Sequence, residues 1–143
     1  MLLIVLTLCF IWGNSFMPAS VSDAISGWFK DLINGILGST GSRLNGDGVL
    51  RKVAHASEFA VLGIVVTPFV TNKLKNRLTT LALCGLGTAL LDETIQLVVI
   101  GRNSQIKDVW IDFGGFTVGV MLSLFVNGLV RRHNRKTKYQ SRC

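Results

Sequence analysis

Long apolar stretches constrain this chain of 143 residues more than any other feature. A helix that crosses a bilayer needs about 20 mostly apolar residues, because it rises about 1.5 Å per residue through roughly 30 Å of hydrocarbon. Stretches 53–70, 78–100 and 109–130 fall in this range, and none alternates apolar and polar residues as a membrane β-strand does. The composition, 49% apolar and 16% charged, agrees. We therefore predict an all-α, polytopic membrane protein.

A shorter apolar stretch, residues 1–16, begins the chain. Such a stretch can be a cleaved secretion signal or a membrane anchor. No Lys or Arg precedes it, and Asn14 and Ser15 lead into Met17 and Pro18 rather than into a cleavage site with two small residues. We expect an uncleaved helix and four transmembrane helices in total. They form a membrane domain over residues 1–130, which a basic tail follows over residues 131–143.

The net charge of +7 is concentrated beside the ends of the predicted helices. Nine of the 15 basic residues lie after the second and fourth helices, with no acid among them. Cytoplasmic segments have this pattern under the positive-inside rule, so we expect both termini in the cytoplasm. Basic segments beside a membrane also contact anionic lipid, and we expect no nucleic-acid partner. The nine residues are Lys73, Lys75, Arg77, Arg131, Arg132, Arg135, Lys136, Lys138 and Arg142.

Residues 22–37 fall outside the membrane in this topology and show helical periodicity. Ile25, Trp28, Phe29 and Leu32 share one stripe of the predicted helix. We expect an amphipathic helix in the first outer loop. Three roles are open to it: it lies in the outer head-group region, packs over the bundle as a lid, or connects two helices while shielding core residues.

Polar residues of all four predicted helices gather near the outer ends, where Asn14 and Ser15 end the first helix. Arg51, His55 and Glu58 are spaced four and three apart and share one helix face, while Asp92 and Glu93 lie roughly two turns below the surface. Ionisable side chains at such depths are costly unless paired or wetted, so they should face the bundle interior or a water-filled cavity. The candidate polar site comprises Arg51, Lys52, His55, Glu58, Asp92, Glu93, Gln96, Arg102, Asp108 and Asp112.

A structural network is the alternative explanation for these residues. The basic residues at positions 51, 52, 102 and 107 could neutralise most of the acids and hold the helices together. Buried ion pairs, however, stabilise a protein less than apolar packing of similar volume. Adjacent acids at 92 and 93 also point about 100° apart on a helix, which is wasteful if only one partner is wanted. We therefore favour a functional site.

Small residues in the last two helices predict close helix packing. Gly85, Gly87 and Ala89 lie in the third predicted helix. Gly114, Gly115 and Gly119 lie in the fourth, where 115 and 119 form a Gly-x-x-x-Gly motif. This motif is a common packing device in membranes and specifies no chemistry.

Three strings carry a family resemblance in their order and separation. They are RKVAHASEF at 51–59, DETIQ at 92–96 and GRNSQIKDVWIDFGG at 101–115, and Asn14-Ser15 with Pro18 and Ser20 fits the same pattern. Together they resemble the VanZ-like family of bacterial membrane proteins, over about residues 11–120. Phe59 stands where an aromatic residue, often Tyr, is usual, and Asp112 where Asn is also common. The resemblance implies a few-helix protein of the bacterial plasma membrane and, from the name-giving member, a link to low-level teicoplanin resistance. It implies no biochemical mechanism.

A binding site is the function that these residues favour. Arg51, Lys52 and Arg102 suit phosphate or carboxylate oxygens, while the acids and Gln96 accept hydrogen bonds from sugar or amide groups. We expect the site to face the outer leaflet. The expected partners are membrane lipids and a lipid-linked cell-wall precursor or a lipoglycopeptide, and oligomerisation is left open.

An intramembrane enzyme is the alternative. His55, Glu58, Asp92, Glu93 and Asp112 could serve as general acid and base or bind a divalent cation. The chain has no metal motif of recognised spacing, so we expect no cofactor and favour binding over catalysis. Transport by a monomer is disfavoured because the ionisable groups stop in the outer half of the helices, although an oligomer could supply a path between subunits.

Overall fold

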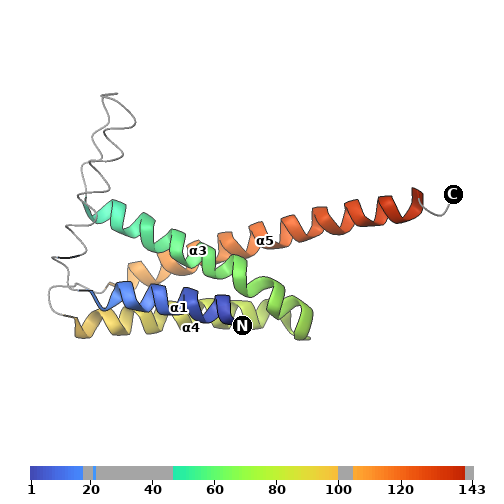
Figure 1. Ribbon diagram of the computed structural model, residues 1–143. Helices are drawn as coiled ribbons and strands as arrows, with labels where there is room; N and C mark the ends of the chain where they lie inside the picture. The colour runs from blue at the N-terminus through green and yellow to red at the C-terminus, as the bar shows by residue number, and fades with distance from the viewer. Residues whose placement is uncertain (18–20, 22–46, 100–104, 141–143) are drawn as a thin grey trace, which may run out of the picture.

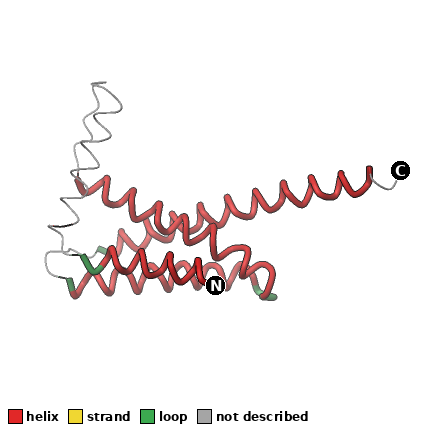
Figure 2. Tube along the Cα trace, in the orientation of Figure 1, coloured by secondary structure: helices red, strands yellow, loops and turns green. Residues whose placement is uncertain are grey.

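The computed structural model describes residues 1–17, 21, 47–99 and 105–140, without the side chains of 47–51 and 133–140. The described part contains α1 (Leu2–Ser15), α3 (Asp47–Lys73), α4 (Arg77–Val98) and α5 (Ile106–Gln140), shown in Figure 1. Helices and loops make up this part, with no strand in it (Figure 2). The predicted all-α fold is thus confirmed, while the expected amphipathic helix at 22–37 lies outside the described residues.

Neighbouring helices along the described chain run in opposite directions. The C-terminal ends of α1 and α4 lie at the same end of the bundle as the N-terminal ends of α3 and α5 (Figure 1). The α5 helix continues past the bundle to Gln140, because the basic residues that follow its apolar part are good helix formers. The predicted tail therefore begins as an extension of the last helix.

Three helices are long and apolar enough to cross a membrane. Their candidate spans are Lys52–Lys73, Arg77–Val98 and Ile106–Arg132, whereas α1 has 14 residues and is shorter. Large apolar side chains cover the outside of these spans; Leu83, Val118 and Phe125 are all more than half exposed. An apolar surface of this extent is expected against lipid and not against water. The fold is therefore that of a membrane protein.

Glycine and alanine bring α3 and α5 into close contact. A Cβ atom on Gly115 or Gly119 would collide with the backbone of Ala56 or Ala60, and one on Gly63 would collide with the backbone of α5. The predicted role of the Gly-x-x-x-Gly motif in helix packing is confirmed. We call these five residues the α3–α5 seam.

Buried apolar side chains from α1, α3, α4 and α5 form the core of the bundle. The Phe116 ring of α5 packs directly on Gly85 of α4, where any larger residue would displace it. Gly87 of α4 and Gly114 of α5, by contrast, face open space, so the predicted helix contact holds for Gly85 and is wrong for Gly87 and Gly114. The buried apolar residues are Ile11, Phe59, Leu62, Val66, Val70, Leu81, Ala89, Val109, Phe116 and Val120.

Hydroxyl groups in the bundle are satisfied by backbone carbonyls. Thr67 donates to the Gly63 carbonyl oxygen at 2.7 Å, and Thr117 donates to that of Phe113 at 2.8 Å. Ser123 of α5 donates across the seam to the Ile64 carbonyl oxygen at 3.3 Å. These hydroxyls therefore need no water or ion beside them.

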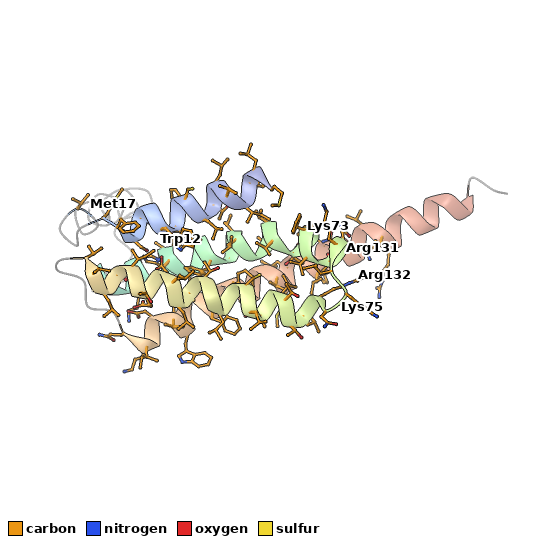
Figure 3. The ribbon with its side chains drawn as sticks, turned by 90° about the horizontal axis from the view of Figure 1, so that it is seen from below. Trp12, Met17, Lys73, Lys75, Arg131 and Arg132 are labelled. Atoms are coloured by element: carbon orange, nitrogen blue, oxygen red, sulfur yellow. The ribbon has the colours of Figure 1, made fainter. Side chains whose placement is uncertain are left out.

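Basic and polar residues occupy opposite ends of the bundle. Figure 3 shows Lys73, Lys75, Arg131 and Arg132 at one end and Met17 at the other. The four basic side chains are exposed, and we call this the basic end. The opposite end contains the polar residues from all four described helices.

Candidate functional site

The last turn of α1 joins two other helices through hydrogen bonds. Asn14 Nδ2 donates to Glu58 Oε1 of α3 at 2.7 Å, and Ser15 Oγ donates to Asp92 Oδ1 of α4 at 2.6 Å. Ser15 is completely buried. The short first helix is therefore anchored to the bundle by its polar C-terminal turn.

Asp92 is the most deeply buried acid of the described side chains, with an exposed fraction of 0%. Its Oδ1 accepts the Ser15 bond, and its Oδ2 accepts a hydrogen bond from Gln96 Nε2 at 2.7 Å. Gln96 lies one turn after Asp92 on α4, so the carboxylate is held from its own helix as well as from α1. Both donors are neutral. They orient the carboxylate without balancing its charge.

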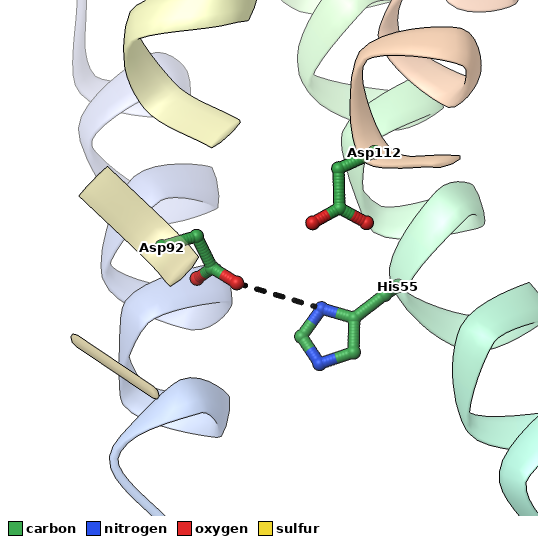
Figure 4. A group of neighbouring side chains, drawn as sticks. All are labelled: His55, Asp92 and Asp112. Carbon is green, nitrogen blue, oxygen red and sulfur yellow. Dashed lines mark ion pairs between the residues drawn. The ribbon is translucent and has the colours of Figure 1, made fainter. Parts of the chain in front are cut away.

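His55 lies between two carboxylates. Its Nδ1 is 3.9 Å from Asp92 Oδ2 (Figure 4) and 3.9 Å from Glu58 Oε2. The side chain is buried. These distances exceed those of a normal hydrogen bond, so the imidazole interacts with both acids mainly through charge when it is protonated.

Asp112 of α5 completes the cluster. Its carboxylate points into the space between His55 and Asp92 (Figure 4), and it is 2% exposed. One ligand atom from each of the three residues lies within 4.8 Å of the other two. Among the residues that the structure describes, Asp112 has no hydrogen bond and no ion pair. A buried carboxylate without a partner is costly, and this one has acids as neighbours.

A small pocket opens beside this cluster. Its cavity volume is about 20 Å³, which is enough for one or two water molecules. Pockets that enclose a whole small molecule are typically about 300–1,000 Å³, so this pocket admits a single chemical group. Its lining residues are Lys52, His55, Glu93, Gln96, Asp108, Ile111 and Asp112.

An ion pair lies at the edge of this pocket. Lys52 Nζ of α3 is 2.7 Å from Asp108 Oδ1 of α5, and the two side chains are 37% and 18% exposed. The pair joins the second turn of α3 to the first turn of α5 and neutralises Asp108. The positive charge of Lys52 is thus already matched.

The structure brings most of the predicted site residues into one layer. Arg102 lies outside the described residues, as does the side chain of Arg51, although Arg51 belongs to α3. Asn14 and Ser15, which end the first apolar stretch, were not among the candidates and prove to hold two of them. We call the following residues the polar layer: Asn14, Ser15, Lys52, His55, Glu58, Asp92, Glu93, Gln96, Asp108 and Asp112.

The polar layer places several hydrogen-bond acceptors, mostly carboxylate oxygens, around the imidazole of His55. Glu93, 5% exposed, and Gln96, 7% exposed, add an acceptor each to the pocket lining. The arrangement can accept hydrogen bonds from a ligand, transfer a proton through His55, or hold a cation. A purely structural network of paired charges would account for Lys52 and Asp108 but leaves Asp112 without a role.

A family model described as VanZ/LLP1 matches residues 1–127. This range includes α1, α3, α4 and most of the candidate membrane span of α5. No curated protein and no solved structure matches the chain.

Proposed function

The chain belongs to the VanZ/LLP1 family, and we propose that it binds a polar group of an envelope lipid or lipid-linked wall precursor at the outer leaflet of a bacterial plasma membrane. The observation that carries this proposal is the small polar pocket between α3, α4 and α5. Polar side chains inside a membrane protein are expensive, and those that line a cavity typically contact a ligand, an ion or water.

The distribution of charge supports an outer position for the pocket. Lys73, Lys75, Arg131 and Arg132 mark the opposite end of the bundle (Figure 3), and the positive-inside rule assigns that end to the cytoplasm. Four crossings then place both termini inside. At 1.5 Å per residue, α1 is about 21 Å long, so it crosses with local thinning of the bilayer or with an unwound residue at its end.

The pocket lining favours a ligand group that donates hydrogen bonds. Glu93, Gln96 and Asp112 offer acceptor oxygens, whereas Lys52 is already paired with Asp108. Sugar hydroxyls and amide N–H groups of a wall precursor are donors of this kind. Because the cavity is about 20 Å³, one such group enters and the rest of the molecule lies along the outer leaflet.

The size of the pocket also bears on the link to teicoplanin. A whole lipoglycopeptide does not fit inside it. Protection against the antibiotic would therefore come from a change in the access or composition of its target surface. The VanZ-like resemblance supports this link, and the pocket supports a lipid or a precursor as the molecule bound.

Teicoplanin susceptibility of cells that express the full chain tests this function. We expect the wild type to raise the inhibitory concentration of teicoplanin and Glu93→Gln to remove most of that protection, because the pocket loses an acceptor. Thr94→Ala is the matched control, since Thr94 is exposed on the same helix and its hydroxyl donates to the Leu90 carbonyl oxygen one turn earlier. Equal protection by Glu93→Gln and the wild type, at equal membrane levels, would overturn the role of the pocket.

An intramembrane enzyme is the second candidate function. The approach of His55, Asp92 and Asp112 to within 4.8 Å favours it, because a buried imidazole between carboxylates can act as a general base. Purified protein mixed with a lipid-linked wall precursor distinguishes the two functions. Binding predicts complex formation with the precursor unchanged after hours, whereas catalysis predicts a product of altered mass that His55→Gln does not form.

A further inference from the structure

We propose that His55, Asp92 and Asp112 form a binding site for a divalent transition-metal ion. The three residues come from α3, α4 and α5, and one ligand atom of each lies within 4.8 Å of the other two. No metal motif in the sequence marks this site, because its ligands are brought together by helix packing and not by spacing along the chain.

The distances suit a metal site that closes slightly around its ion. His55 Nδ1 and Asp92 Oδ2 are 3.9 Å apart. Two ligand atoms bound to one Zn²⁺ ion at 2.0–2.2 Å in tetrahedral geometry are about 3.4 Å apart. A small side-chain rotation therefore brings these atoms into coordination. Figure 4 shows that the Asp112 carboxylate faces the same space from the third side.

The charge balance of the three residues favours a bound cation. Asp92 accepts hydrogen bonds from Ser15 and Gln96, which are neutral, and Asp112 has no partner among the described residues while it is 2% exposed. One imidazole at 3.9 Å from Asp92 compensates the charge of two buried carboxylates only weakly. A divalent ion between them would balance both charges.

Two hydrogen bonds hold the Asp92 carboxylate in place, as expected for a residue that ligates a metal ion. Ser15 Oγ fixes one carboxylate oxygen at 2.6 Å and Gln96 Nε2 fixes the other at 2.7 Å. Hydrogen bonds of this kind hold ligating carboxylates in the orientation that the metal needs. The C-terminal turn of α1 therefore contributes to the site without reaching the ion.

The donor set selects the type of ion. One imidazole nitrogen with two carboxylate oxygens suits Zn²⁺ or Mn²⁺ better than Ca²⁺, which prefers six to eight oxygens. Three protein ligands leave a coordination position open toward the pocket. That position would take water or an anionic oxygen of the bound ligand. This last role rests on the proposed function, whereas the metal site itself does not.

Metal content of the purified full chain tests the site. The chain is prepared in detergent without a histidine tag, loaded with ZnCl₂ and dialysed. We expect about one Zn²⁺ per wild-type chain and at least a tenfold weaker affinity in Asp112→Asn, which loses a ligand but no hydrogen bond. Asp108→Asn and His133→Gln are matched controls, because the first removes a carboxylate from the same pocket and the second removes the only other histidine.

Two results would overturn this proposal. One is a wild-type chain that retains less than a tenth of an equivalent of Zn²⁺ and of Mn²⁺. The other is equal loss of metal in Asp108→Asn or His133→Gln and in Asp112→Asn, because the ion would then be bound elsewhere. No lipid or antibiotic is present in the assay, so its failure is distinct from a failure of the proposed function.

Cobalt substitution tests the ligands in the wild-type protein without relying on a variant. Co²⁺ bound to an imidazole and two carboxylates in a four-coordinate site has visible absorption several times stronger than hexaaqua Co²⁺. We expect this absorption to saturate at about one equivalent and to disappear when Zn²⁺ is added. Absorption no stronger than that of free Co²⁺ would contradict a built site.

Discussion

The α3–α5 seam and the polar layer both hold helices together, but by different physical means. In the seam, glycines of α5 meet the backbone of Ala56 and Ala60 of α3, and no charge is buried. In the polar layer, completely buried groups such as Ser15 and Asp92 meet through hydrogen bonds. Close backbone packing joins helices in a membrane without burying polar side chains. The polar layer also joins helices, but its buried polar groups carry a desolvation penalty.

We propose that this difference separates structural residues from functional ones. If the chain needed only stability, apolar residues in place of the polar layer would serve at least as well. The seam already gives α3 and α5 an extended contact. Asp112 makes the contrast clearer, because it is a buried carboxyl group that joins nothing that the structure describes. We therefore attribute the seam to folding and the centre of the polar layer to function.

The largest expected effect concerns the seam. Gly119→Leu places a side chain against the backbone of Ala60, where neither helix can yield without moving apart. We expect a loss of about 3 kcal/mol in the free energy of unfolding, or no folded protein. Gly114→Ala is the control on the same helix, since a Cβ at Gly114 meets nothing within 4 Å. Thermal unfolding in detergent gives the comparison, and equal midpoints for both variants would show that the seam is not a close contact.

A smaller effect is expected where the polar layer does contribute to stability. Asp92→Ala leaves the Ser15 hydroxyl and the Gln96 amide without their acceptor. We expect a loss of about 2 kcal/mol in the free energy of unfolding, because buried donors without partners are costly. Thr94→Ala, at an exposed position of α4, should leave the midpoint of thermal unfolding unchanged. A midpoint for Asp92→Ala equal to that of the wild type would mean that α1 is held by other contacts.

The ion pair at the edge of the layer should contribute least among the bonded groups. Lys52 is 37% exposed on its side chain, and partly exposed pairs contribute at most about 1 kcal/mol. Lys52→Gln should therefore lower the free energy of unfolding by about that amount, and the difference should shrink at high salt. Lys107→Gln, an exposed position beside Asp108, is the control. A loss above about 3 kcal/mol would assign the pair a structural role as large as that of the seam.

The sequence predicted the helices well because their signal is local. Apolar runs of about 20 residues identify membrane helices without any knowledge of packing. The predicted stretches 53–70 and 78–100 correspond to α3, Asp47–Lys73, and α4, Arg77–Val98. The differences lie at the ends: α4 stops at Val98 because Val99 is extended, whereas charged residues continue α3 and α5 beyond the apolar stretches. For this reason α5 starts at Ile106 and extends to Gln140.

The site was only partly predictable, because its key distances join distant parts of the chain. The depth of each acid could be read from its position in a helix, and that placed Asp92, Glu93 and Asp112 at one level. Which of them meet depends on the rotation of each helix about its axis. Helical spacing could not show that Asp112 would face His55 and Asp92, or that Ser15 would bind Asp92 across 77 residues. The assignment of these acids and of His55 to a functional site stays a prediction.

The stability of Asp112→Asn in chelator-treated protein tests the central claim most directly. If the centre of the polar layer is kept for function and not for stability, replacing its unpartnered carboxyl group by an amide should leave the free energy of unfolding unchanged or raise it by about 0.5 kcal/mol. The same variant should lose metal binding and teicoplanin protection. A fall of more than about 1 kcal/mol would contradict the account, since Asp112 would then hold the bundle together as the seam does.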